Sequence, residues 1–305
     1  MRRLYETRHI PAARRLAAWL LAAVFSLSLC VQSAWAAPAA SAERTVIPLG
    51  KAVGIKLFAA GVLVVGLADG DTPARTCGLR QGDIITAMDG TAIDSTEQVQ
   101  SLLAEAAGQE TTLTVRRGSS TLALSACARP GAGGVWQLGA WIRDSMAGIG
   151  TLTYYDPATG QYGALGHGIT DVDTAQLMPL ASGSIMETRV KAVKKGRKGD
   201  PGELKGDFSV QRDVGTVTVN SDGGIFGTVA DGEFLSGGTP VPVATAQQVK
   251  TGRATILATI SGSDTTEYQV EIVRLYGADE PTRNMLLRIT DPRLLSATGG
   301  IVQGM

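Results

Sequence analysis

The feature that most constrains the fold is the alternation of short apolar runs with turns rich in Gly, Asp and Pro. The 305 residues include 38 glycines. Runs such as 61–65, 225–229 and 254–258 have the length of strands and are bounded by turn residues. One stretch, residues 96–107, has a helical period, with a Ser95–Gln98 capping box at its start. The sequence therefore predicts a mainly β protein.

Composition and charge exclude several classes of protein. Hydrophobic residues make up 44% and charged residues 18%, which is too apolar for a disordered chain and too charged for a polytopic membrane protein. Lys and Arg number 28, as do Asp and Glu, so the basic excess typical of a nucleic-acid binder is absent. Three cysteines exclude a disulfide-dense scaffold and a four-cysteine zinc site. The sequence implies no metal and no other cofactor.

Residues 1–36 have the layout of a secretory signal peptide. A basic start with five arginines precedes the apolar run Leu16–Val31, and Ala34-Trp35-Ala36 forms a cleavage pattern of small residues. We expect export across the cytoplasmic membrane with cleavage after Ala36, the alternative being an uncleaved anchor at residues 16–31. Residues 37–44 are then a linker. Beyond them, Cys77 and Cys127 either form a disulfide in an oxidising compartment or stay unpaired.

Residues 45–130 read as one β-rich module. A Gly-Asp corner, a strand, an Asp-Gly turn, a second strand, the helix at 96–107 and a closing hairpin follow one another, with Gly82-Asp83-Ile84-Ile85, Asp89-Gly90 and Ile93 as the marking residues. Their order and spacing resemble a PDZ domain. The resemblance implies that an extended peptide binds as an added strand between the second strand and the second helix. It places the loop that receives the peptide carboxylate at Val53, Gly54 and Ile55. The alternative is a module that only braces the next domain.

A second domain is expected at residues 138–305, after a linker at 131–137. His9 lies in the signal segment, so His167 is the one histidine of the exported part. A single histidine cannot form a multi-histidine metal site, but it can serve as general base for a serine nucleophile. The residues alone leave this role and that of a turn histidine without chemistry both open. Asp171 and Asp173 are expected to be turn residues, with orientation of the histidine or cation binding as alternatives.

Nearly the whole chain resembles the SpoIVB peptidases, which are serine endopeptidases of endospore-forming bacteria. The resemblance is carried by the signal segment, the PDZ-like module and three motifs, at residues 166–174, 289–295 and 298–305. It implies a chymotrypsin-like β-barrel with His167 as the catalytic histidine and Asp291 as the residue that orients it. It also implies action between mother cell and forespore, where such enzymes cleave a membrane-bound sporulation regulator and themselves.

One departure concerns the nucleophile. In the family the Gly-Met pair is followed by Ser-Gly-Ser-Pro, whose first serine attacks the substrate, whereas this sequence ends at Met305. Gly304 matches the position two before that serine, whose N–H contributes to the oxyanion hole. The chain as given is therefore expected to be inactive, with a C-terminally incomplete peptidase domain. The alternative function is a non-catalytic PDZ protein that binds peptides.

Overall fold

The computed structural model describes residues 44–230, 232–235, 238–277, 280 and 283–305. The expected signal segment and all but the last residue of the expected linker at 37–44 lie outside these residues. Contacts divide the chain into two units, residues 1–44 and 45–305, and the second is described below. Within the described part, no helix is long and apolar enough to cross a membrane.

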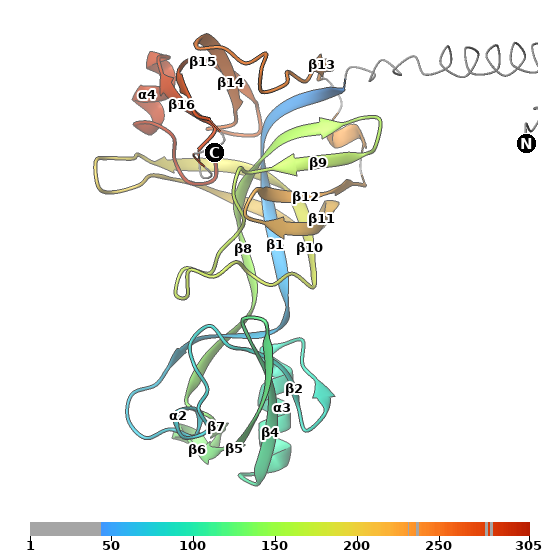
Figure 1. The fold of residues 1–305 in the computed structure, drawn as a ribbon, viewed down its shortest axis with the longest axis vertical. Helices are drawn as coiled ribbons and strands as arrows, with labels where there is room; N and C mark the ends of the chain where they lie inside the picture. The colour runs from blue at the N-terminus through green and yellow to red at the C-terminus, as the bar shows by residue number, and fades with distance from the viewer. Residues whose placement is uncertain (1–43, 231, 236–237, 278–279, 281–282) are drawn as a thin grey trace, which may run out of the picture. The chain divides into compact units, whose positions relative to one another are not determined.

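The centre of the second unit is a closed β-barrel of six antiparallel strands. The first half of the long strand β1 (Thr45–Leu67) pairs with β8 on one edge and with β10 on the other. Pairings from β8 through β9, β12 and β11 to β10 complete the ring, so this part has no free edge. Figure 1 shows β1, β8 and β10 running side by side. The other five strands are β8 (Ala140–Asp156), β9 (Gln161–Ala164), β10 (Ser182–Lys194), β11 (Glu203–Ser221) and β12 (Gly224–Val229).

Alternating apolar residues along these strands fill the barrel. Val53, Ile55 and Leu57 of β1 are 0–1% exposed and contact a cluster from the facing strands. Because strand side chains alternate between faces, this period-2 pattern points every second residue into the barrel. The facing strands contribute Leu152, Tyr162, Ile185, Val214, Val217 and Ile225.

The second half of β1 leaves the barrel and enters the part expected to be a PDZ domain. There Val62 and Leu63 pair with β2, and residues 63–67 pair with the first residues of β8. The helix α3 (Thr96–Ala106) begins where predicted, because the Ser95 side chain accepts a hydrogen bond from the Gln98 N–H. The remaining elements of this part are α2 (Pro73–Thr76), β2 (Ile84–Met88), β3 (Thr91–Ala92), β4 (Glu110–Arg117), β5 (Ser120–Cys127), β6 (Arg129–Pro130), η1 (Ala132–Gly134) and β7 (Trp136–Gln137).

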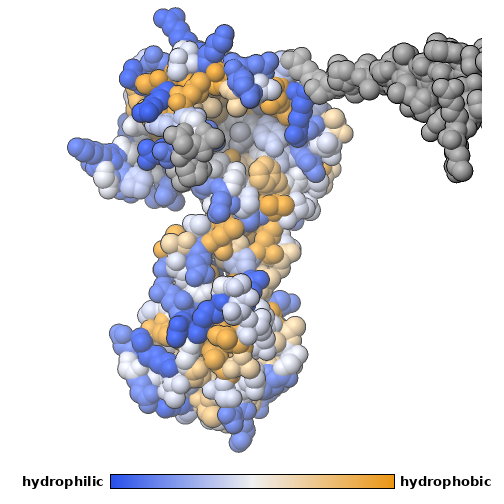
Figure 2. All heavy atoms as spheres, in the orientation of Figure 1, coloured by the Kyte–Doolittle hydropathy of each residue, from blue (hydrophilic) through white to orange (hydrophobic). Residues whose placement is uncertain are grey.

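The C-terminal residues form a small open sheet and a short helix. The sheet has the order β14–β15–β16, and the helix α4 (Pro292–Thr298) follows it. Asp291 caps the start of α4, and Gly299, with φ of 74°, ends it in the left-handed region. Figure 2 shows apolar surface over this region, where Met285, Leu286 and Leu287 are exposed. The elements not yet named are η2 (Gly232–Leu235), β13 (Val241–Pro242), β14 (Gly252–Ala258), β15 (Thr266–Leu275) and β16 (Met285–Ile289).

The structure confirms a mainly β chain that contains a PDZ-like part and a further β domain. The six-stranded ring is closed, and β14, β15 and β16 form a separate sheet. β1 begins at Thr45 and runs through both the barrel and the PDZ-like part, so the barrel includes residues that the sequence assigned to the PDZ domain. The expected linker at 131–137 is packed rather than free: the Trp136 ring packs against Gly108, and its carbonyl accepts a hydrogen bond from Gln100. Cys77 and Cys127 are unpaired.

The expected carboxylate-binding loop is the clearest correction. Val53, Gly54 and Ile55 lie in the interior of β1, each paired in register with both β8 and β10. Their backbone N–H groups therefore belong to strand ladders, and the side chains of Val53 and Ile55 are part of the barrel core. Placing a peptide-binding loop at these residues was wrong.

Candidate active site

His167 lies in the irregular segment between β9 and β10 and is exposed at the mouth of a pocket of about 350 Å³. Its Nδ1 lies 2.9 Å from the carbonyl oxygen of Gly168. A carbonyl only accepts, so a proton on Nδ1 satisfies this bond and leaves the lone pair on Nε2. A neutral imidazole held in this way is suited to accept a proton from a hydroxyl in the pocket.

The backbone beside His167 is packed closely, as expected for a histidine flanked by glycine on its C-terminal side. A Cβ at Gly168 would lie 2.6 Å from the carbonyl oxygen of Ser221 and would overlap the Leu177 side chain. Asn220 of β11 fixes the next residue: its Oδ1 accepts from the Ile169 N–H at 2.8 Å, and its Nδ2 donates to the Ile169 carbonyl at 3.0 Å. At Gly166, by contrast, a Cβ would meet nothing within 4 Å.

The structure brings Gly304 into the same pocket as His167. The Gly304 carbonyl accepts a hydrogen bond from Thr151 Oγ1 at 2.6 Å. The preceding residue is also tied to the barrel, because the Leu204 N–H donates to the Gln303 carbonyl at 2.9 Å. Gly304 has a φ of 89°, a conformation that favours glycine. Two of the three catalytic-site residues expected from the sequence, His167 and Gly304, thus line one pocket.

Asp291 is not brought to His167. It is 4% exposed, and its carboxylate accepts hydrogen bonds from the Arg293 side chain, the Arg293 N–H and the Gln269 N–H. The hydrogen bonds from the Arg293 side chain, more than any other contact, hold the pKa of Asp291 well below its usual range. In this structure the carboxylate anchors the start of α4, and the expected orienting contact with His167 is not made.

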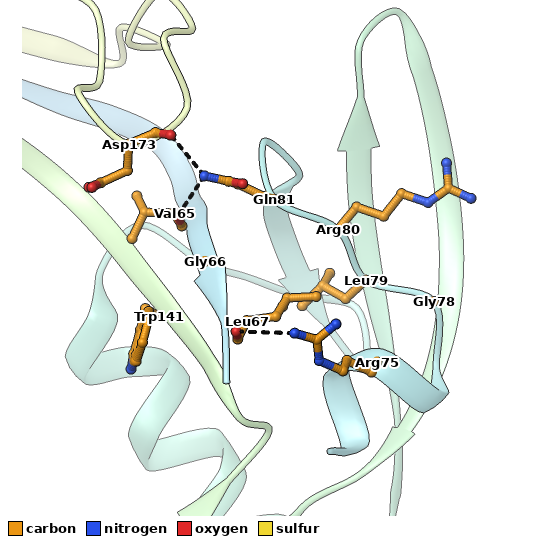
Figure 3. A pocket seen from close by; sticks show the side chains of 10 residues that line it. All are labelled: Val65, Gly66, Leu67, Arg75, Gly78, Leu79, Arg80, Gln81, Trp141 and Asp173. Atoms are coloured by element: carbon orange, nitrogen blue, oxygen red, sulfur yellow. Dashed lines mark hydrogen bonds between the residues drawn. The ribbon is translucent and has the colours of Figure 1, made fainter. Parts of the chain in front are cut away.

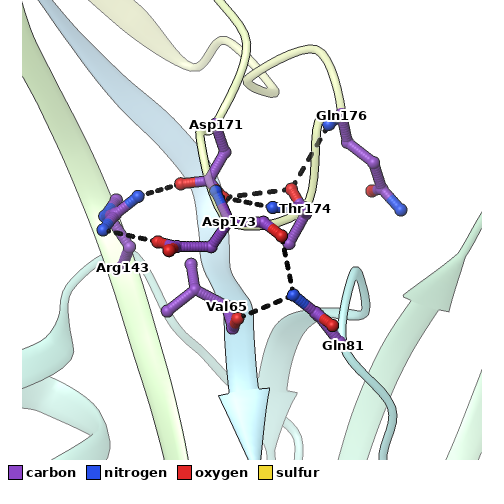
Figure 4. A network of polar contacts seen from close by, with 7 residues as sticks. All are labelled: Val65, Gln81, Arg143, Asp171, Asp173, Thr174 and Gln176. Atoms are coloured by element: carbon purple, nitrogen blue, oxygen red, sulfur yellow. Dashed lines mark hydrogen bonds and ion pairs between the residues drawn. The ribbon is translucent and has the colours of Figure 1, made fainter.

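The carboxylates near the His167 segment are instead Asp171 and Asp173, which bond with Arg143 of β8 (Figure 4). Asp171 is fully buried, and its Oδ1 accepts from Thr174 N and Oγ1 and from Asp173 N at 2.9–3.1 Å. Burial acts to raise the pKa of Asp171, but the bonds from Thr174, the Arg143 charge and the Asp173 N–H together lower it. The sequence identified the turn; it gave no signal for Arg143, 28 residues away.

A groove of about 280 Å³ lies beside α3, and it is a better candidate for peptide binding than the loop expected from the sequence. Val99 and Leu103 of α3 line one side, and Leu138, Ala140 and Ile142 line the other. Residues 140–143 of β8 pair with β1 on one edge, and no strand within the described residues pairs with the other edge. An apolar helix face beside an unpaired strand edge is the geometry that accepts an extended peptide as an added strand.

A larger pocket of about 860 Å³ lies beside the same stretch of β8, between Trp141 and the segment around Gln81 (Figure 3). Trp141 is 66% exposed and covers Gly66 of β1, where a Cβ would lie 2.9 Å from its ring. Gln81 Nε2 donates to the carbonyls of Val65 and Asp173 at 3.0 and 2.8 Å. This bond joins the PDZ-like part to the segment that carries His167.

Comparisons with known proteins agree with these two parts. The sequence model of the family described as SpoIVB peptidase S55 matches residues 134–305, and a PDZ domain model matches residues 64–117. A search of curated proteins gave no significant match. Among solved structures, the PDZ domain of the SdrC-like protein from Listeria monocytogenes is 22% identical, with a TM-score of 0.25, and the match covers 27% of this chain and 87% of that one. The PDZ match begins where β1 has left the barrel, and the peptidase match includes the strand that lines the α3 groove.

Proposed function

The chain belongs to the SpoIVB peptidase S55 family of serine peptidases, and we propose that it is an endopeptidase that signals between compartments during endospore formation. We propose a membrane-bound sporulation regulator as its substrate and the enzyme itself as a second one. Export directed by residues 1–36, with cleavage after Ala36 or retention of an anchor at 16–31, would place it between mother cell and forespore. The observation that carries the proposal is the shared pocket of His167 and Gly304.

Two groups of the pocket, His167 and Gly304, have roles in the proposed acyl transfer. His167 Nε2 takes the proton of the attacking serine and later gives it to the leaving amine. In the proposed mechanism the Gly304 N–H contributes to the oxyanion hole, the role that the family resemblance implies. The serine is the residue that follows Met305 in the family. We therefore propose cleavage for a chain that carries Ser-Gly-Ser-Pro after Met305, and none for residues 1–305 alone.

The test is to sequence the DNA past codon 305, express the whole reading frame, and follow self-cleavage on gels and hydrolysis of a quenched-fluorescent peptide library. We expect His167→Ala to lower the rate by more than about 1,000-fold, since triad residues act as a unit. The matched control is His9→Ala, which changes the chain's other histidine and should leave the rate unchanged. Cleavage that persists in His167→Ala would refute the catalytic assignment.

A second function, peptide binding, is favoured by the groove beside α3. We propose that an extended peptide with a free C-terminal carboxylate pairs with β8 at residues 140–142 and packs against Val99 and Leu103. In a chain without a nucleophile, this would be the whole function. Gln100 is exposed and lines the groove, so Gln100→Trp should weaken peptide affinity at least about tenfold. Gln109→Trp, at an exposed position outside the groove lining, is the control. Equal affinities of the two variants in calorimetric titration would rule out this placement.

A further inference from the structure

We propose that Gln81 and Arg143 couple the peptide groove beside α3 to the position of His167. The proposal rests on the proposed function, because it takes the groove as the peptide site and His167 as the general base. Both residues are positioning residues that act through the segment carrying His167. The coupling would let a bound peptide alter the geometry of the catalytic pocket.

The first step of the argument is the construction of the His167 segment, which depends on Asp171. This carboxylate is fully buried four residues after His167 and closes a turn through Asp173 and Thr174. Its second oxygen bonds with Arg143, whose other terminal nitrogen lies 3.0 Å from Asp173 Oδ2. Arg143 therefore bridges two carboxylates of one turn, which a planar guanidinium does well and a lysine does not. The position of the turn follows the position of Arg143.

The second step is the place of Arg143 along β8. The residues just before it, Ala140 to Ile142, line the peptide groove, and those just after it, Met146 to Ile149, line the His167 pocket. Arg143 is paired in register with Leu63 of β1. A peptide that hydrogen-bonds to the free edge of residues 140–142 thus binds the strand that carries Arg143, within three residues of it.

The third step is a second connection from the PDZ-like part, made by Gln81. Its side-chain amide donates to the Asp173 carbonyl and to the Val65 carbonyl of β1, as Figures 3 and 4 show. Beside it, Gly82 packs so closely on Gln176 that a Cβ there would overlap the amide group. The turn that follows His167 is therefore attached to both the groove strand and the PDZ-like part.

Coupling between the peptide groove and the His167 segment must be reciprocal: each site affects the other. If peptide binding multiplies the equilibrium constant between two His167 geometries by a given factor, then the peptide affinities of those two geometries differ by the same factor. Couplings of this kind are typically about 5- to 150-fold. Arg143 and Gln81 supply the physical contacts between the two sites, so removing either should reduce the coupling.

The first experiment tests the connection without any ligand. NMR of the 305-residue chain labelled at histidine follows the imidazole Cε1–H signals at fixed pH, and His9→Gln identifies the signal of His167. A uniformly labelled sample of the same chain reports amide exchange. We expect Gln81→Ala to displace the His167 signal and to speed amide exchange at residues 169–176 at least about fivefold. Gln109→Ala is the control and should do neither. The unfolding midpoints of the two variants should agree. A His167 signal in Gln81→Ala that coincides with the control's would overturn the coupling.

The second experiment adds a probe peptide, an acetylated hexapeptide of alternating Thr and Val with a free C-terminal carboxylate. Calorimetric titration measures its affinity, and NMR measures its effect on His167. We expect binding to shift the His167 signal, and Gln81→Ala to reduce both that shift and, at least about fivefold, the affinity. Binding that leaves His167 unmoved would overturn the coupling and spare the proposed groove. If the peptide fails to bind, the groove proposal falls, while the first experiment still decides the connection through Gln81.

Discussion

The ion pair between Arg143 and Asp171 gives the sharpest test of the electrostatic argument, because its two members differ in burial. Asp171 is fully buried, whereas the Arg143 side chain is 32% exposed. Arg143→Met leaves a buried carboxylate with hydrogen bonds only at one oxygen. Asp171→Asn keeps the turn-closing oxygen and leaves behind a cation that can reach water and Asp173. We therefore expect the arginine substitution to be the more damaging of the two.

The expected losses in the free energy of unfolding follow from this difference in burial between Asp171 and Arg143. Removing one partner of a buried ion pair costs about 3–5 kcal/mol, and partial exposure of Arg143 places Arg143→Met near about 3 kcal/mol. Asp171→Asn loses a charge-assisted hydrogen bond, which is worth about 2 kcal/mol. The control is Arg288→Met, which breaks an exposed pair with Glu271, where the cost is about 0–1 kcal/mol.

Urea unfolding followed by tryptophan fluorescence and circular dichroism at pH 7 measures all three variants. With a slope of about 3 kcal/mol per molar urea, Arg143→Met should move the midpoint by about 1 M. An Arg143→Met midpoint within experimental error of Arg288→Met would refute the buried-pair argument, and a greater loss in Asp171→Asn would refute the order.

The pH dependence of the free energy of unfolding tests whether folding lowers the pKa of Asp171. The pKa of Asp171 is lowered by folding, so its contribution is complete above its unfolded pKa of about 4 and is lost as pH falls through the folded value. Between pH 7 and 5 the gap between wild type and Asp171→Asn should be constant, and below about pH 4 it should shrink. A gap that widens on acidification would contradict the assignment.

Three further predictions concern the rest of the unit. Asp291→Asn should loosen α4, seen as faster amide exchange at residues 292–298; because folding lowers the Asp291 pKa, wild type should approach the variant's exchange rates only below about pH 4. Gly50→Ala should lower the free energy of unfolding by at least about 1 kcal/mol more than the control Gly160→Ala. Both glycines have positive φ, but a Cβ at Gly50 would overlap the Leu257 backbone, whereas a Cβ at Gly160 meets nothing within 4 Å. Tyr162→Phe should lower the free energy of unfolding by about 1 kcal/mol, because the hydrogen bond from the phenol to the Thr216 carbonyl is lost. Burial raises the pKa of Tyr162, so an alkaline absorbance titration should show this phenol ionising only as the chain unfolds.

The sequence predicted those elements whose structure is determined by residues close together in the chain. The capping box at Ser95 and the apolar face of residues 99–106 were sufficient to predict α3. The position of β1 was beyond such signals, because an apolar run such as residues 52–57 suits a peptide-binding strand and a barrel strand equally well. Residues 53–57 pair with partners that lie 89 to 134 residues further along the chain. The ion pair between Arg143 and Asp171 could not be predicted either, because the two residues are 28 positions apart and meet only through the fold.

The barrel and the PDZ-like part share two strands, so neither is a separate domain in this chain. β1 supplies a wall of the barrel with its first half and a central strand of the PDZ-like part with its second, and β8 does the same in reverse order. The groove beside α3 thus has its helix in the part matched as a PDZ domain and its strand in the part matched as a peptidase. A peptide in that groove would bind both at once. The ladder between the two strands shifts register between Phe58 and Leu63, where the barrel joins the PDZ-like part. The proposed coupling is therefore carried by Arg143 and Gln81, which contact the turn after His167.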